Sequence, residues 1–266
     1  MVSNRGKTAF DKELTQLHNR NVFEPIHPSQ LTQLEKDKAM NSLIFLTEKK
    51  DRTIKARACA NGSSQKPYID KHNATSPTVT TEALLTTAVI DAKQNRDVVT
   101  LDIPNAFVQT PVPPSNEKVI MKITGLLVGY LVNLFPSKYK DYVITQNQSK
   151  ILYIVMKKPL YGVMLSSLLF YKHFRMDLES VGFEVNPYDI CVANRVVNGH
   201  QQTVTWHVDD VKISHISKQA NEEFIKWCER KYGSELNRHV KVKKGKKHEY
   251  LGMTLDYSEK NTLNEI

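Results

Sequence analysis

The sequence predicts an α+β fold in which an antiparallel sheet is backed by helices. Three segments support this in chain order: a valine-rich strand over 98–102, a long helix over 165–181 and a hairpin over 191–208. The hairpin prediction depends on Asn198-Gly199, a dipeptide suited to a two-residue turn between β-rich runs. The resulting β-α-β-β order is expected to bring the acidic residues that follow two of these strands to one edge of the sheet.

The N-terminal part of the chain is expected to combine helices with a basic hairpin. Phe10, Leu14 and Leu17 have helical spacing and predict a helix over 10–18. Further elements are expected at 29–40 (a helix capped by Ser29), 42–47 and 53–60 (the strands of the hairpin) and 82–94 (a helix capped by Thr81).

The remaining elements are predicted from shorter patterns. Residues 103–116 hold four of the 11 prolines and are expected to form a loop. Strands are predicted at 119–123 and 151–155, and the stretch 124–150 between them is expected to be an insertion that contains one helix. Near the start of the chain, Val22–Pro25 is expected to break the first helix. A helix over 218–232 and a strand over 249–256 complete the expected fold.

Composition limits the class of partner. The 37 Lys and Arg residues against 28 Asp and Glu give a formal charge of +9, which favours a polyanion, although an indifferent basic surface is the alternative. The three dispersed cysteines argue against a disulfide framework or a zinc module. No signal segment opens the chain, and no apolar run approaches the ~18 residues that span a bilayer. An intracellular protein of the cytoplasm or nucleus, without a membrane partner, is therefore expected.

Acidic residues at strand ends are the candidate catalytic groups. Asp102 ends the strand over 98–102, and Asp209-Asp210 follow the strand over 203–208. Adjacent carboxylates repel each other, and a divalent cation removes that penalty. Magnesium prefers such oxygen ligands together with phosphates, and two ions can stabilise an in-line phosphoryl displacement. The alternative is that these are solvated turn residues, which are common.

Seven short segments, in the same order, resemble blocks of reverse transcriptases of the Ty1/copia retrotransposon type. The resemblance runs from about residue 10 to residue 257, and the last catalytic block has His207 where the family has tyrosine. The segments are Lys55-Ala-Arg57, Ser76-Pro-Thr-Val79, Leu101-Asp-Ile-Pro-Asn-Ala-Phe107, Leu160-Tyr-Gly162, Gly182-Phe183 with Pro187-Tyr-Asp-Ile-Cys191, His207-Val-Asp-Asp210 and Tyr250-Leu-Gly-Met253.

The resemblance implies a polymerase palm with an N-terminal fingers subdomain. Residues 1–96 would be the fingers-like region, 97–257 the palm with an insertion at about 112–150, and 258–266 a truncated tail. The implied activity is RNA-directed DNA polymerisation, a nucleotidyl transfer from a dNTP to a primer 3′-hydroxyl with two Mg²⁺ or Mn²⁺ ions. The implied partners are an RNA or DNA template with its primer, dNTP and other parts of a Pol polyprotein.

The resemblance also implies roles for single residues. Asp102 and Asp209 would ligate both metals and Asp210 would assist. The implied substrate-binding residues are Arg57 and Lys55 on the triphosphate, Phe107 under the sugar, and Tyr161 and Gly162 at the templating pair. Each has a plainer alternative: surface cations for Arg57 and Lys55, a core ring for Phe107, and a turn before the helix for the last two. His207 receives no catalytic role, and Trp206, on the opposite strand face, is expected in the core.

The sequence departs from the family in three places that leave other functions open. Val163–Leu169 stands where many members have Lys-Gln-Ala-Pro-Arg, Asn61 replaces a basic residue, and little length remains for a thumb and none for RNase H. A catalytically inactive, transposon-derived nucleic-acid-binding remnant is therefore the alternative. A metal-dependent nuclease ranks last, because the Glu and His cluster it would need near Asp209 is not evident.

Overall fold

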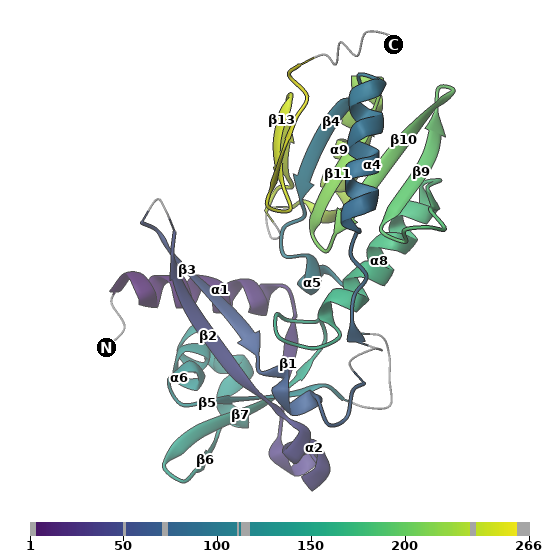
Figure 1. The fold of residues 1–266 in the computed structure, drawn as a ribbon. Helices are drawn as coiled ribbons and strands as arrows, with labels where there is room; N and C mark the ends of the chain where they lie inside the picture. The colour runs from purple at the N-terminus through teal and green to yellow at the C-terminus, as the bar shows by residue number, and fades with distance from the viewer. Residues whose placement is uncertain are drawn as a thin grey trace. The chain divides into compact units, whose positions relative to one another are not determined.

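The chain forms two compact units in the computed structural model (Figure 1), which describes residues 4–49, 52–70, 74–110, 112, 118–234 and 238–259. The first unit comprises Met1–Thr75 with Phe107–Leu169, and the second comprises Ser76–Ala106 with Phe170–Ile266. The boundary expected between 96 and 97 does not coincide with this division. Each unit is assembled from two separate stretches of sequence.

A mixed sheet organises the first unit. Its strands are ordered β1-β7-β5-β2-β3, with β6 paired to β7, and all neighbours are antiparallel except β2 and β5. The β2–β3 hairpin confirms the pair of strands predicted near 42–47 and 53–60. The strands are β1 (Phe23–Ile26), β2 (Met40–Glu48), β3 (Ile54–Ala60), β5 (Ile120–Thr124), β6 (Ile144–Gln146) and β7 (Ser149–Met156).

The longest helix of the first unit is α1, and its other described helices are short. The predicted apolar stripe of α1, formed by Phe10, Leu14 and Leu17, is buried. Leu14 and Leu17 share a core cluster with Val128 of α6 and Leu152 of β7. The helices are α1 (Asn4–Asn19), α2 (Gln33–Lys38), α5 (Ala106–Gln109), α6 (Leu126–Leu134) and α7 (Pro136–Tyr139), with 3₁₀ turns η1 (Pro28–Gln30), η2 (Gly62–Gln65) and η3 (Lys140–Tyr142).

The second unit contains a six-stranded sheet in the order β12-β4-β11-β10-β9-β8, with every neighbouring pair antiparallel. The β9–β10 hairpin turns at Asn198 and Gly199, whose φ values of 51° and 77° confirm the predicted turn. The strands are β4 (Asp97–Asp102), β8 (Glu184–Val185), β9 (Val192–Val197), β10 (His200–His207), β11 (Asp210–His215) and β12 (Lys241–Lys244).

Both faces of this second sheet are covered. On one face lie α8 (Ser166–Ser180) and α9 (Lys218–Tyr232): the ring of Phe174 in α8 packs 5.7 Å from Trp206, and Gln202 donates to Ala220 O of α9. Trp206 is 1% exposed, which confirms its predicted core position. On the other face lie α4 (Thr81–Lys93) and the hairpin of β13 (Lys247–Tyr250) and β14 (Met253–Asp256), and Figure 1 shows α4 crossing that face. None of the described helices is long and apolar enough to cross a membrane.

Several predicted boundaries were wrong for local reasons. Thr32, not Ser29, caps α2, because its side chain accepts from Glu35 N and Glu35 accepts in return. Thr80, not Thr81, caps α4. The strand expected over 249–256 is a hairpin that reverses at Leu251 and Gly252, both with positive φ. The insertion 124–150 holds α6 and α7 rather than one helix, and residues 23–26 form strand β1 rather than a break. The expected loop 103–116 contains α5, and its residues 111 and 113–117 lie outside the described residues.

Candidate functional site

Two of the three candidate carboxylates lie side by side at the ends of two neighbouring strands of the second sheet. Asp102 is the last residue of β4 and Asp210 the first of β11, and the antiparallel register pairs them directly. Side chains of directly opposed residues point to the same face of a sheet. The sequence therefore predicted correctly that residues more than a hundred positions apart would meet at one strand edge.

Asp209 occupies the tight turn between β10 and β11. His207 pairs with Asp210, so Val208 and Asp209 form a two-residue loop, and Ile103 N donates to Asp209 O at 3.0 Å. This bond ties the turn to the end of β4. Within the described residues, however, no three acidic, histidine or cysteine side chains come close enough to hold a metal ion. The structure therefore brings Asp102 and Asp210 together and does not gather all three aspartates.

The turn has a strained backbone at Val208. Its φ is +56°, a conformation that a β-branched residue rarely adopts because Cβ crowds the carbonyl oxygen. Such strain persists where surrounding contacts hold it, and it is often found at functional sites. Here the His207–Asp210 pair and the bond from Ile103 hold the turn on both sides.

Replacing Val208 by asparagine, which tolerates positive φ, is expected to raise the free energy of unfolding by about 1 kcal/mol. Val196→Asn is the matched control, because Val196 is 74% exposed in β9 and has no positive φ. Urea denaturation would measure both. A loss of stability in Val208→Asn equal to that in the control would contradict the assignment of strain.

The charges around the paired carboxylates act in opposite directions. Partial desolvation, followed by the nearby Asp102 charge, raises the pKa of Asp210, whereas His207 and Lys241 lower it. Asp210 is exposed, so solvent screening limits the energetic weight of this shift. Lys241 of β12 lies opposite Asp102 on its other side, and its ammonium donates to Asp102 Oδ2. Asp102 thus has a carboxylate as one strand neighbour and an ammonium as the other.

Four of the predicted substrate-binding residues gather in the first unit. Arg57 of β3 stacks over the ring of Tyr161, 5.0 Å from its centroid, and Tyr161 meets Phe107 edge to face at 4.8 Å. Lys55, two residues from Arg57, lies on the same strand face. Arg57 is exposed, and Lys55, Phe107 and Tyr161 are half-buried, so these groups form a cationic and aromatic surface.

Gly162 allows the backbone of the 161–162 segment to pack closely against the end of β3 inside the first unit. Its φ is +89°, and a Cβ added there would lie 1.9 Å from Ala60 O. Ala60 N donates to Tyr161 O at 2.8 Å, which joins the 161–162 segment to the end of β3. Gly162 therefore lies in close contact with the chain's own backbone, a packing role that the sequence did not predict.

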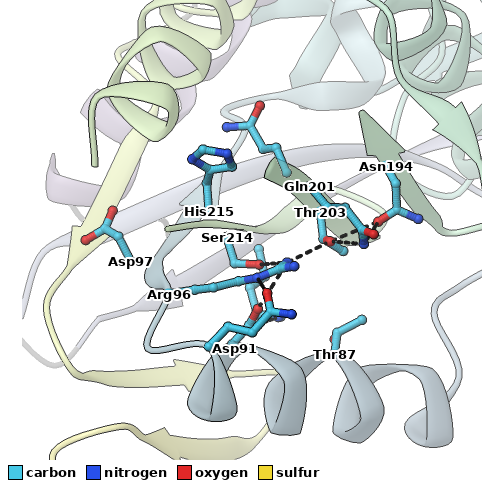
Figure 2. A network of polar contacts seen from close by, with 12 residues as sticks. Thr87, Asp91, Arg96, Asp97, Asn194, Gln201, Thr203, Ser214 and His215 are labelled. Atoms are coloured by element: carbon cyan, nitrogen blue, oxygen red, sulfur yellow. Dashed lines mark hydrogen bonds and ion pairs between the residues drawn. The ribbon is translucent and has the colours of Figure 1, made fainter. Parts of the chain in front are cut away.

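A buried ion network, which the sequence did not reveal, supports the strand that begins at Asp210 (Figure 2). Lys212 Nζ donates to Asp91 Oδ2 of α4 at 2.5 Å, and both side chains are essentially inaccessible. Figure 2 shows Arg96 reaching between α4 and the sheet, where Nη1 donates to Thr203 Oγ1 at 3.0 Å and lies 3.9 Å from Asp91 Oδ1. Along β11, Lys212 alternates with the apolar Val211 and Ile213, a pattern typical of a strand with one exposed face, so the sequence offered no signal of its burial.

Two further residues position the site from its flanks. Asp189, in the motif near Cys191, accepts from Thr80 N and Thr80 Oγ1 at 2.8 and 2.9 Å and so anchors the start of α4. Tyr250, in the Tyr250-Leu-Gly-Met253 motif, donates towards Asp210 O and Thr205 O at 3.2 and 3.3 Å. Two of the sequence motifs therefore have structural roles, one at the start of α4 and one at the β10–β11 hairpin.

Comparison with known proteins gives a consistent but distant relationship. Over 250 residues, 94% of its length, the chain is 22% identical to the Truncated transposon Ty1-A Gag-Pol polyprotein of Saccharomyces cerevisiae, of which it covers 19%. The identity is the same with the Transposon Ty1-DR5 and Ty1-ML1 Gag-Pol polyproteins of that yeast, of which it covers 13%. The chain spans less than a fifth of these relatives, and no family model matches it. These similarities support an origin in a Ty1/copia-type retrotransposon.

Proposed function

We propose that this chain is the reverse transcriptase region of a Ty1/copia-type Pol polyprotein, an RNA-directed DNA polymerase with a palm-type second sheet. The observation that carries the proposal is the direct pairing of Asp102 and Asp210 across β4 and β11, beside a strained turn that carries Asp209. The similarity to Gag-Pol polyproteins along 94% of the chain supports it independently.

The donor chemistry fits divalent metal ions in part. Carboxylate oxygens are the ligands that Mg²⁺ and Mn²⁺ take, and Asp102 and Asp210 supply them in register, with Asp209 one residue away in the turn. When bound, two such ions would stabilise the attacking and leaving oxygens of a phosphoryl transfer. The β4–β11 pairing supplies two adjacent carboxylates, and Asp209 in the neighbouring turn is the candidate for a third.

The other residues have roles that follow from their chemistry. Arg57 can bind phosphate oxygens through two donors at once, with Lys55 adding a second cation on the same strand face. Tyr161 and Phe107 offer ring surfaces for a base or sugar, and the chain's excess of basic residues favours a nucleic-acid template with its primer.

Primer extension on an RNA template, with dNTPs and Mg²⁺ or Mn²⁺, tests the proposal. Asp102→Asn and Asp209→Asn are each expected to reduce extension about 10³-fold, since metal ligation is worth several kcal/mol. Asp141→Asn, an exposed carboxylate in η3, is the matched control and should extend normally. Extension that persists in Asp102→Asn would overturn the assignment of the site.

The second candidate function is a nucleic-acid-binding remnant without catalysis. It is favoured by the absence, within the described residues, of a three-membered metal-binding group and by the ion pair that Lys241 forms with Asp102. Primer-template binding without extension in the parent protein, measured by fluorescence anisotropy, would support this alternative.

A further inference from the structure

The second sheet places Asp102 between two charged neighbours of opposite sign. Among the described residues of the proposed site, no other residue has such a pair of neighbours. β4 pairs with β11 on one side and with β12 on the other, so Asp102 is opposed by Asp210 and by Lys241. The Lys241 ammonium donates to Asp102 Oδ2 and also lowers the pKa of Asp210. The Lys241 and Asp102 side chains are 75% and 37% exposed, so this is a displaceable surface ion pair.

The other lysines of the same segment have different partners. Five lysines occupy 241–247. Lys244 pairs with Glu222, Lys247 with Asp256, and Lys246 donates to Asn95 Oδ1 at 3.4 Å. Lys243 is opposite Thr100, on the same face as Lys241, and within the described residues it forms no ion pair. Lys241 is therefore distinguished from its neighbours by position and not by residue type.

We propose that Lys241 is a built-in counter-cation that competes with the divalent metal ion for Asp102, an inference that rests on the proposed function of the site. A metal ion and an ammonium cannot share one carboxylate oxygen at contact distance, because like charges repel strongly at short range. A metal ion that takes Oδ2, or both oxygens, of Asp102 therefore displaces Lys241. The apparent metal affinity is lowered by the free energy of the ion pair that is broken.

When the metal is absent, the ion pair between Lys241 and Asp102 offsets part of the negative charge of the site. Two carboxylates on directly paired strand residues repel each other, and where solvent screens only part of this repulsion the Lys241 ammonium offsets a further part. Lys241 is held beside them by its own pairing with β4, and the flexible stem of lysine lets the ammonium withdraw when a metal ion arrives.

Mn²⁺ binding to the full chain, followed through the electron paramagnetic resonance signal of free Mn²⁺ at low ionic strength, tests the inference without primer or nucleotide. Lys241→Met is expected to tighten Mn²⁺ binding about threefold more than Lys243→Met, the size expected for one exposed ion pair. Lys243→Met removes the same charge from the same strand face, so it reports the general electrostatic effect. Lys241→Arg, which keeps the charge, should bind Mn²⁺ close to the parent protein.

The outcomes separate this inference from the proposed function. Equal tightening in Lys241→Met and Lys243→Met would overturn the specific competition, as would Mn²⁺ binding that Asp102→Asn leaves unchanged. Tighter binding in Lys241→Met together with no primer extension would sustain the competition at Asp102 while refuting polymerase activity. Circular dichroism of each variant confirms that the fold is retained, and both lysines are exposed.

Discussion

Gly162→Ala is expected to lower the free energy of unfolding of the first unit by about 3 kcal/mol or more, from overpacking plus a positive φ. The added Cβ would lie 1.9 Å from Ala60 O, and a Cβ added at Gly62 would lie 2.1 Å from Gly162 O, so these backbone segments are already in close contact. Both tryptophans, Trp206 and Trp227, belong to the second unit, so far-UV circular dichroism in urea is the appropriate measurement.

Gly182→Ala is the matched control for this effect. Its φ of +86° is nearly that of Gly162, but no atom lies within 4 Å of the position of an added Cβ. It should lose only the conformational cost of a positive φ, about 1 kcal/mol. If the two variants lose the same stability, the close approach of Gly162 to Ala60 is not what requires glycine.

Asp91→Asn is expected to destabilise the second unit by about 3–5 kcal/mol, because it leaves two buried cations without their carboxylate. Lys212 and Arg96 are both buried, and Asp91 is the acidic group they share. Tryptophan fluorescence in urea would follow the loss, since Trp206 lies on β10 in the same sheet. The double variant Asp91→Leu with Lys212→Met should recover the part of the stability that belongs to Lys212, because an apolar pair replaces that ion pair, while Arg96 still lacks its carboxylate.

The pH dependence gives a second measurement on the same network. Desolvation lowers the pKa of Lys212 and the Asp91 charge opposes that shift, so removing Asp91 should lower the pKa further. A lysine with a folded pKa below its unfolded value releases its proton on folding, so stability rises with pH between the two values. The deficit of Asp91→Asn should therefore shrink as the pH rises towards 10.5, the ordinary lysine pKa. A deficit independent of pH would contradict the burial of a charged Lys212.

Local patterns allowed a correct prediction wherever a local interaction decides the structure. Asn198-Gly199 supports both positive φ values of a two-residue turn, and α9 has the predicted bounds because its apolar residues repeat with helical spacing. Strands that carry the candidate carboxylates were expected in one sheet, as β4 and β11 are, but the direct partner of Asp102 is Asp210 and not Asp209.

Features decided by distant contacts could not be predicted in this way. Strand β12 is exposed along its length and rich in lysine, so it has no apolar alternation, and only pairing with β4 reveals its position. The burial of Lys212 depends on Asp91, which lies on a helix far away in the sequence. The division of the chain was also hidden, because 107–169 joins the N-terminal residues through pairings of β5 and β7 with β2 and β1.

The interleaved units have a consequence during translation. Phe23 pairs with Met156, Met40 with Met121, and Asp97 of β4 with His215, so the partners of early strands leave the ribosome much later. Until then, the nascent chain carries strand edges from both units without their partners, and such edges favour association between molecules. Contacts this distant in sequence also slow folding. Neither unit can therefore be completed co-translationally before most of the chain has been synthesised, and chaperone binding to the emerging N-terminal half would have the longest opportunity to act.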